Sequence, residues 1–385
     1  MTPVSRKALG ILAYLVFLFV FVEVALQAFY YATAGDFLFR RVGVAIFAPD
    51  PHSGVFNRPG LELEHGTQEF SATYYTDEAG LRVSAPGARY VQDKPEGTYR
   101  VMLLGPSFAF GWGVDFEDTF AAILERELES RKFASARDIE VVNAGVPSMP
   151  AAPHLRWFEA VGRDYDPDLV VQFIYGSMVV PNRPQPDARV DDEGYLIPKD
   201  YRLGRRVRAQ LKKFATVFYG WVLWTRLDSL LQEEQEADGG AVLGAGRELA
   251  TAVDFDPRRD DVREALDFYE DLRRVVTEAG SDLLVVYFPL SYAIHRSDVS
   301  RWKHLGVHDV EAQIAFDRDF ARHLSSLGLP TKDITGELAE AAADGERLYY
   351  WLDIHWTPAG NEVAARAIAE HLVETRSPRG EGVLR

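Results

Sequence analysis

The chain has 385 residues, no cysteine, and a formal net charge of −16 from 42 Lys and Arg against 58 Asp and Glu. Its 47% apolar and 26% charged content is ordinary for a globular protein and excludes a largely disordered or collagen-like chain. The acidic balance argues against nucleic acid as a partner, because nucleic-acid binding requires positive charge that displaces counterions. The absence of cysteine excludes disulfides, thiolate metal ligands and a cysteine nucleophile.

An apolar stretch near the N-terminus predicts a single membrane-spanning helix. Residues 8–32 contain one charge, Glu23, and about 20 residues of helix are enough to cross a bilayer. Glu23 is expected near the far interface, and Tyr30 and Tyr31 in an aromatic belt. Two alternatives stay open for this stretch: a buried core helix, and a signal peptide cleaved near Ala34.

The charged residues that flank the stretch do not decide its orientation, because basic residues occur on both sides of it. A short N-terminal tail followed by a long soluble body is typical of a body that lies outside the membrane. We therefore expect an uncleaved anchor that crosses the cytoplasmic (inner) membrane once, with the soluble domain extracytoplasmic.

The remainder of the chain has two patterns. Residues 45–98 lack a helical period and carry short β-prone runs, which predicts a small β-rich lead-in after the anchor and flank at 1–44. Residues 99–385 alternate strands with amphipathic helices, which predicts an α/β domain whose parallel sheet is covered on both faces. Strands are expected at 99–104, 139–142, 169–175, 283–288 and 331–334, and helices at 118–131, 151–163, 258–279, 310–327 and 358–374.

The alternation is interrupted by an insertion at residues 181–257. Residues 199–213 hold seven basic residues and one acidic residue, and aromatic residues follow closely. Residues 202–224 are open to three interpretations: a helix on an anionic membrane surface, a lid over the site, or a solvated helix packed on the domain. Residues 233–250 are acidic and then rich in Gly and Ala, which is typical of a flexible linker.

Reactive side chains follow the predicted strands, and ligands of an open parallel sheet bind at the carboxyl ends of its strands. These side chains are Ser107 after the first strand, Asn143 and Gly145 after the second, Ser177 after the third, and Asp353 and His355 before the last helix. Each of them alone is more often structural than catalytic. Their joint placement indicates a site.

The set has the composition of a serine hydrolase site. A serine hydroxyl is a weak nucleophile, so it needs a base and a third group that orients the base. His355 can act as the base for Ser107, and Asp353 can hold the other ring nitrogen. The candidate oxyanion donors are the Ser107 N–H, the Gly145 N–H and the Ser177 hydroxyl.

Three sequence blocks around these residues resemble the SGNH (GDSL-type) hydrolase family. They read LGPSFAFGWGV at 104–114, NAGVP at 143–147 and DIHWTPAG at 353–360. The resemblance implies a flavodoxin-like three-layer α/β/α sandwich. It also implies a catalytic set in which Ser107 is the nucleophile, His355 the base, Asp353 the carboxylate and Gly145 an oxyanion donor.

Other segments resemble the same family's membrane-anchored bacterial members. Residues 50–82 are similar to a β-rich segment that precedes their catalytic domain, and residues 22–26 are similar to their anchor. The last block, at 353–360, is similar to that of bacterial proteins that add or remove O-acetyl groups on exported polysaccharides. Two positions depart from the family pattern: Pro106 replaces an Asp, and Ser177 replaces an Asn that completes the oxyanion hole.

These observations predict a membrane-anchored serine esterase or O-acyltransferase that acts on an extracytoplasmic glycan or lipid. The alternative is a catalytically inactive glycan-binding protein or accessory subunit of a cell-envelope complex, which Pro106 and Ser177 favour. Other envelope-biosynthesis proteins are expected as partners. The candidate substrate contacts are Asn143, Trp112, Trp351 and Trp356.

No cofactor is expected for this chemistry. A metal hydrolase is disfavoured because His304 and His308 lack the intervening Glu of an H-E-x-x-H motif, and His355 has no partner His at helical spacing.

Overall fold

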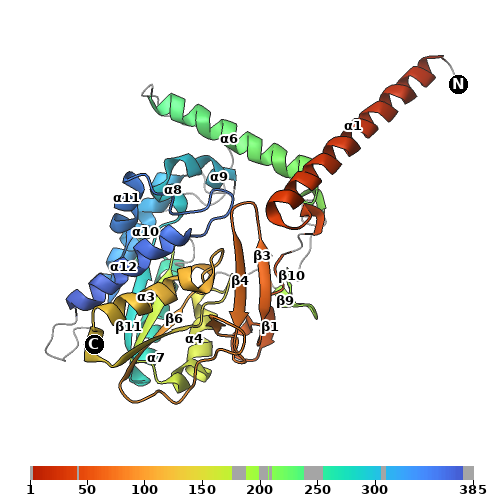
Figure 1. Ribbon diagram of the computed structural model, residues 1–385. Coiled ribbons are helices and arrows are strands. Elements are labelled where there is room, and N and C mark those ends of the chain that lie inside the picture. Colours follow the sequence, from red (N-terminus) through yellow and green to blue (C-terminus); the bar gives the residue numbers. More distant parts are fainter. Residues whose placement is uncertain are drawn as a thin grey trace.

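The structure is a computed structural model that describes residues 3–40, 43–175, 188–198, 207, 210–237, 255–304 and 309–375 (Figure 1). Helix α1 (Pro3–Ala34) projects from an α/β body, and a second long helix, α6 (Ala215–Ala237), leaves the body near the base of α1.

The body is built on a sheet that has eight strands within the described residues, in the order β12-β11-β8-β6-β7-β5-β4-β3. The parallel strands are β6 (Thr98–Leu104), β7 (Asp138–Asn143), β8 (Leu169–Ile174), β11 (Asp282–Tyr287) and β12 (Thr331–Asp333). Numbered one to five in chain order, these strands lie 2-1-3-4-5, which is the strand order of flavodoxin-like folds. The strand order reverses beside β6, so a binding crevice is expected at the carboxyl end of β6.

The β-rich lead-in extends this sheet at one edge. Strands β3 (Glu62–Gly66), β4 (Ser71–Thr76) and β5 (Arg82–Val83) are antiparallel, and Arg82 of β5 pairs with Asn143 of β7. A separate hairpin precedes them, formed by β1 (Phe47–Asp50) and β2 (Gly54–Asn57). The sheet is therefore mixed, with a parallel centre and an antiparallel edge that comes from the N-terminal side.

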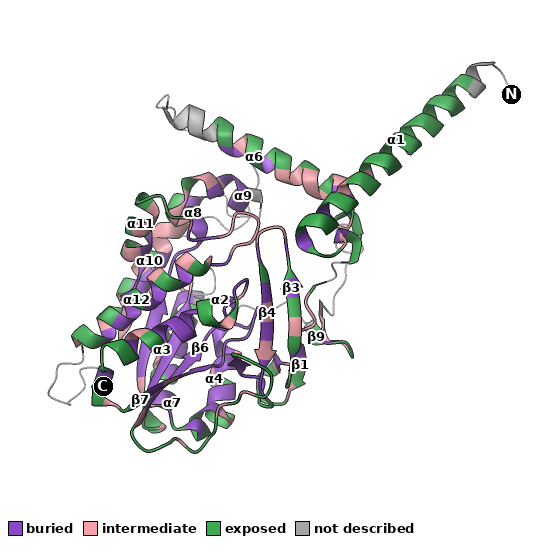
Figure 2. Cartoon of the chain, viewed as in Figure 1, coloured by how far each residue is buried: buried purple, intermediate pink, exposed green. Residues whose placement is uncertain are grey.

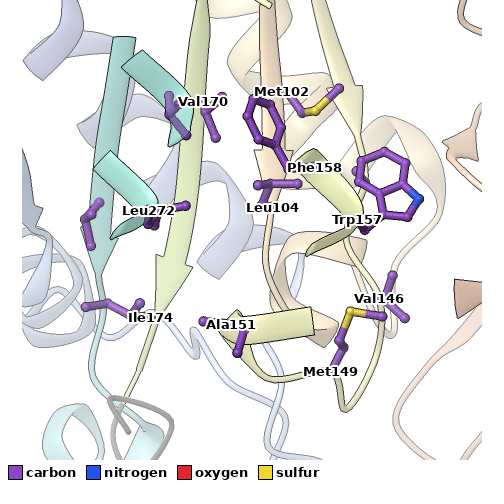
Figure 3. Close-up of a cluster of buried hydrophobic side chains, with 14 of the residues drawn as sticks. Met102, Leu104, Val146, Met149, Ala151, Trp157, Phe158, Val170, Ile174 and Leu272 are labelled. Atoms are coloured by element: carbon purple, nitrogen blue, oxygen red, sulfur yellow. The ribbon is translucent and has the colours of Figure 1, made fainter. Parts of the chain in front are cut away.

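Both faces of the parallel strands are covered, because their residues are apolar on both sides. Met102 and Leu104 of β6 belong to one core, and Val101 and Leu103 belong to the core on the opposite face. Figure 3 shows the first core, where Trp157 and other side chains near α4 meet the sheet. The three-layer α/β/α arrangement that the sequence predicts is confirmed.

The helices divide between the two faces. The first core includes residues of α4 (Ala151–Ala160), α7 (Asp260–Glu278) and α10 (Val310–Ser326), and the second includes residues of α3 (Phe120–Ser130), α11 (Thr335–Ala343) and α12 (Pro358–Thr375). The shorter helices are α2 (Ser107–Phe110), α8 (Ser291–Ile294) and α9 (Val299–His304). Helices α8, α9 and α11 were not among the predicted elements.

Helix α1 is not a core helix. Within the described residues, one helix is long and apolar enough to cross a membrane, residues 7–34 with mean hydropathy 2.6, and none of its most apolar stretch is buried. The core-helix alternative is therefore wrong. Tyr31 is exposed, but Tyr30 is 2% exposed and packs edge-on against Phe218 of α6, so Tyr30 does not belong to an aromatic belt.

Glu23 joins the two long helices. Its carboxylate accepts hydrogen bonds from the backbone N–H groups of Ala215 at 2.7 Å and Thr216 at 2.9 Å, at the N-terminus of α6. Gln27 donates to Glu23 at 2.8 Å and to the Lys213 carbonyl at 2.9 Å. A carboxylate is stabilised at a helix N-terminus by unpaired N–H groups and the helix dipole. The one charge in the apolar stretch therefore has a structural partner.

The described part of the insertion contains a hairpin of β9 (Ala188–Val190) and β10 (Leu196–Pro198) in addition to α6. Helix α6 begins at residue 215, later than the predicted 202–224 helix, and continues through residue 237. The prediction of a flexible linker from residue 233 is therefore wrong for residues 233–237, which are helical. Residues 232–237 read QEEQEA, and Gln, Glu and Ala are strong helix formers. Residues 238–250 lie outside the described residues.

Asp317 of α10 is a buried carboxyl group at 1% exposure, and it accepts a hydrogen bond from Gln313 at 2.7 Å. Burial raises the pKa of Asp317 to about 7 although hydrogen bonds from Gln313 and Tyr287 lower it. The folded protein therefore binds this proton more tightly than the unfolded chain, whose Asp pKa is about 3.9. Stability should decline as pH rises from about 4 to about 7 and then level off.

In the wild type, the titration of Asp317 should lower the free energy of unfolding by on the order of 2 kcal/mol between about pH 5 and about pH 8. We expect Asp317→Asn to lack this decrease when the free energy is measured by urea unfolding. Asp319→Asn is the matched control, because Asp319 lies on the same helix and pairs with Arg322 at the surface. Equal pH dependence in wild type and Asp317→Asn would contradict the prediction.

Candidate active site

Ser107 is the first residue of α2 and directly follows the tight turn that ends β6, at the carboxyl end of the strand where the sheet order reverses. Gly105 has φ of +155°, and a Cβ at this position would lie 2.7 Å from Cβ of Phe173. Pro106 precedes the first helical residue, so its missing N–H costs no helix hydrogen bond. The turn carries Ser107 clear of the sheet, with its side chain 7% exposed.

The structure brings Ser107, His355 and Asp353 together across 248 positions of sequence. His355 Nε2 lies 2.5 Å from Ser107 Oγ, and His355 Nδ1 is hydrogen-bonded to Asp353 Oδ1. The His355 backbone N–H also donates to Asp353 Oδ1 at 3.0 Å. An imidazole that donates from Nδ1 presents a lone pair at Nε2, which is the arrangement required to accept the serine proton.

Aromatic rings enclose the imidazole. Phe108 lies with its ring centre 4.9 Å from that of His355, and Trp112 at 5.8 Å. His355 is 9% exposed. Restricting water around the three groups strengthens the electrostatic interactions among them.

The segment that carries Asp353 is held by a residue of the lead-in. Glu69, in the turn between β3 and β4, accepts the backbone N–H groups of Trp351 at 2.7 Å, Leu352 at 2.7 Å and Asp353 at 2.8 Å. One carboxylate thus binds three successive donors and fixes the backbone of the segment. The sequence analysis did not identify Glu69, and its position 284 residues before Asp353 left no local signal.

Arg301 of α9 holds the same segment from the carbonyl side. Its Nη1 donates to the carbonyl oxygens of Tyr350 at 3.3 Å and Asp353 at 3.0 Å, and also bonds the Trp351 carbonyl. Arg301 is 1% exposed, and burial lowers its pKa. This segment therefore lies between a carboxylate that binds the N–H groups of residues 351–353 and a guanidinium that binds the carbonyl groups of residues 350, 351 and 353.

The proposed oxyanion donors differ in their surroundings. The Gly145 N–H donates to Asn143 Oδ1 at 3.0 Å, and the Asn143 amide is fully buried, with its other contact at the Phe110 carbonyl. Asn143 is therefore a support for the Gly145 loop, and its prediction as a substrate contact is wrong. Among the described residues, the Ser107 N–H has no hydrogen-bond acceptor. Ser177 lies outside the described residues.

Gly145 has a steric reason to be glycine. A Cβ there would lie 2.3 Å from the Phe110 nitrogen and 2.6 Å from the Ala109 carbonyl carbon, both in the backbone of α2. We expect Gly145→Ala to lower the free energy of unfolding by about 1–3 kcal/mol, because the helix that carries Ser107 must move. Gly336→Ala is the control, since nothing lies within 4 Å of its added Cβ. Thermal unfolding that is unchanged in Gly145→Ala would contradict this packing argument.

The three predicted tryptophan contacts have different environments. Trp356 is 1% exposed and packs among Phe108, Phe173 and Phe288, so it is a core residue and its prediction as a substrate contact is wrong. Trp112 is partly buried beside His355, and Trp351 is partly buried beneath the guanidinium of Arg226 at 4.1 Å. Trp112 and Trp351 stay candidates.

No group of three or more His, Cys, Asp and Glu side chains that could hold a metal ion occurs in the described part of the chain.

Residues 248–383 match the family model described as "SGNH hydrolase-like domain, acetyltransferase AlgX". This part of the chain is therefore similar to an SGNH hydrolase-like domain. The resemblance that the sequence blocks indicate is confirmed by this match.

Curated relatives of the chain include proteins named "probable alginate O-acetylase AlgJ". The one from Pseudomonas fluorescens is 26% identical over 170 residues, which cover 42% of this chain and 40% of that protein. The one from Pseudomonas aeruginosa is 24% identical over 166 residues, covering 43% and 40%. The chain therefore matches about two fifths of the length of these relatives.

Solved structures of similar arrangement include TesA, at TM-score 0.38 and 13% identity over 71% of this chain and 98% of that one. Another is a member of the lipolytic G-D-S-L family from Veillonella parvula, at TM-score 0.36 and 11% identity over 72% and 100%. The assignment of the fold rests on the strand order described above.

Proposed function

We propose that this protein is a serine-dependent esterase or O-acyltransferase in which Ser107, His355 and Asp353 are the catalytic residues. The observation that carries the proposal is the 2.5 Å contact from His355 Nε2 to Ser107 Oγ, with Asp353 bonded to the other ring nitrogen. Such an arrangement supplies a nucleophile, a general base and the group that orients the base.

In this reaction Ser107 Oγ attacks the carbonyl carbon of an acyl ester while His355 Nε2 takes the hydroxyl proton. The tetrahedral intermediate collapses as His355 returns the proton to the leaving alcohol oxygen, and an acyl group stays on Ser107. Water or a sugar hydroxyl then attacks the acyl-enzyme, again with His355 as base. The oxyanion accepts hydrogen bonds from the Ser107 N–H, the Gly145 N–H and the Ser177 hydroxyl. The Gly145 N–H would then divide its hydrogen bond between the oxyanion and Asn143 Oδ1.

The substrate that we propose is an extracytoplasmic polysaccharide. Its acetyl esters are the acyl donors in hydrolysis, and its free hydroxyl groups are the acyl acceptors in transfer. The supporting observation is the similarity to proteins named for alginate O-acetylation and to the AlgX acetyltransferase model. Trp112 lies beside His355 and is the tryptophan that we propose to contact the sugar, whereas the ring of Trp351 already stacks with Arg226. Envelope-biosynthesis proteins are the expected partners.

We place the protein in the cytoplasmic membrane, with α1 as a single uncleaved anchor and the body extracytoplasmic. The exposed apolar surface of α1 supports an anchor, since nothing in the described residues covers it. We retain residues 1–44 as the anchor and flank, 45–98 as the lead-in and 99–385 as the catalytic domain, although the lead-in strands extend the same sheet.

A fluorophosphonate probe tests the serine chemistry. The detergent-solubilised full chain should label on Ser107, as read by peptide mass spectrometry, while Ser107→Ala should not label. Release of acetate from an acetylated polysaccharide, compared with transfer to an unacetylated one, then separates hydrolysis from transfer. A wild-type protein that neither labels nor changes any ester would contradict the proposal.

A non-catalytic glycan-binding or accessory protein is the second candidate, and one observation favours it. The Gly145 N–H, a proposed oxyanion donor, is already bonded to Asn143. Loss of one oxyanion donor costs about 10²–10³ in rate. This candidate predicts polysaccharide binding that Ser107→Ala leaves unchanged, together with no probe labelling in wild type.

A further inference from the structure

Helix α6 carries an apolar stripe that the described protein leaves uncovered. Its large exposed side chains recur at the spacing of one helix face, and they are Val217, Leu223, Trp224, Leu227, Leu230 and Leu231, each between 43% and 61% exposed. Positions 216 and 220 of the same arc are Thr and Gly. Over residues 215–231, where the structure describes the side chains of α6, this arc has no charged residue.

The opposite face of α6 is held by the protein. Thr225 is fully buried, and its carbonyl oxygen accepts a hydrogen bond from Ser300 at 3.4 Å. Ser229 donates to the Ser297 carbonyl at 3.2 Å. Figure 2 shows bands of exposed residues alternating with more buried ones along α6. The direction of the apolar stripe is therefore fixed relative to the body.

The level of α6 along α1 indicates what covers the stripe. From residue 8 to residue 22 each residue of α1 is exposed, although the ring of Phe19 lies 6.1 Å from that of Phe214, and Glu23 then binds the first turn of α6. Fifteen residues of helix span about 22 Å at 1.5 Å per residue. The hydrocarbon core is about 30 Å thick. A membrane that contains this part of α1 therefore extends beyond Glu23, to the level at which α6 begins.

Apolar surface continues from one helix to the other. A groove of about 710 Å³ lies between α1 and the residues that directly precede α6, and its lining includes Val24, Phe39 and Phe214, which are 63%, 48% and 40% exposed. The two helices diverge from this junction, so α6 runs across the direction of α1 (Figure 1). A helix that runs across a transmembrane helix at its exit level lies along the bilayer surface.

The charge next to α6 matches an anionic surface. Residues 199–213, immediately before the helix, hold seven basic residues and one acidic residue in a chain whose net charge is −16. Basic residues beside an apolar helix face are typical of helices that lie in the interface of membranes with anionic lipids.

We infer that α6 is an interfacial helix, with its apolar stripe in the outer part of a lipid bilayer and Lys212 and Lys213, which directly precede it, among anionic headgroups. The inference rests on the proposed anchor, because α1 sets the level of the membrane. Arg226 of α6 stacks on Trp351 in the segment that carries Asp353. The lipid-bound helix therefore holds the candidate catalytic segment close to the membrane surface.

The absence of native cysteine allows single-cysteine labelling of the full chain. Leu227→Cys places a fluorophore on the stripe, Val16→Cys places it on the exposed part of α1, and Asp271→Cys places it on an exposed position of α7. Each variant is reconstituted into phosphatidylcholine–phosphatidylglycerol vesicles that contain a spin-labelled lipid. The readouts are quenching by that lipid and quenching by aqueous iodide.

We expect lipid quenching at Leu227→Cys at least about threefold above that at Asp271→Cys, because an interfacial helix buries its apolar face about 5–10 Å into the headgroup boundary. Quenching at Val16→Cys but not at Leu227→Cys would overturn the inference and leave the anchor standing. No lipid quenching at either position would show that the anchor fails, and the inference with it. Protection of Leu227→Cys from both quenchers would mean that a protein partner covers the stripe, and would also overturn the inference.

Discussion

Ser107→Ala is expected to lower kcat for ester hydrolysis by about 10⁴-fold or more, because the acyl-enzyme that we propose forms on the Ser107 hydroxyl. The substrate KM should change little, since the Ser107 side chain is small and 7% exposed, and most of the binding surface remains. Steady-state kinetics with a soluble acetyl ester, in detergent, measure both quantities.

The effects of Ser107 and His355 should not add. The two atoms that exchange the proton lie 2.5 Å apart and act in one step, so His355→Gln alone and the Ser107→Ala, His355→Gln pair should be nearly as inactive as Ser107→Ala. The matched control is Ser130→Ala, because Ser130 is exposed at the end of α3 and its hydroxyl bonds only the Glu127 carbonyl in the described structure. Ser107→Ala with wild-type activity would reject the assignment of the nucleophile.

Glu69→Gln is expected to lower kcat by about 10²-fold, since a displacement of about 1 Å in a catalytic group can cost that much. The Glu69 carboxylate accepts three backbone N–H groups, whereas Gln presents an amide NH₂ to at least one of them. Asp353 and the ring of His355 should then lose their orientation while the substrate pocket keeps its shape. Glu69 touches no reacting atom, so it is a positioning residue.

The test for Glu69 needs a readout that simple destabilisation does not move. We expect the rate of fluorophosphonate labelling of Ser107 and the pH profile of kcat/KM to change in Glu69→Gln, with KM close to wild type. Glu64→Gln is the control on the same hairpin, because Glu64 is exposed on β3. A labelling rate equal to wild type at a temperature where both variants are folded would contradict the positioning role.

Local patterns predicted most of the secondary structure and the parallel sheet. The sequence located β6, β7, β8 and β11 within a few residues, because buried parallel strands contain apolar runs that need no tertiary context to recognise. The short edge strand β12, with the sequence TKD, was also located, although it is only partly buried. The short α8 and α9 were missed, since helices of four and six residues have too few turns to show a period.

The burial of individual side chains could not be predicted in the same way. Trp356 adjoins His355 in sequence but points into the core with Phe108 and Phe288, because neighbouring residues of an extended segment face opposite directions. Asn143 lies at the carboxyl end of β7, where a ligand contact is expected, yet its amide oxygen accepts a hydrogen bond from the Gly145 N–H. In both cases the sequence did not show the direction of the side chain.

By itself, the sequence determined an apolar N-terminal helix and an α/β body, and it singled out Ser107, Asp353 and His355, which we propose as the catalytic residues. Tertiary structure alone decided how these parts are joined. Glu69 meets Asp353 across 284 residues, and Glu23 meets Thr216 across 193. Any residue except proline can donate a backbone N–H to a carboxylate. Such a hydrogen bond therefore does not require a particular side chain at the donor position, and the sequence does not reveal it.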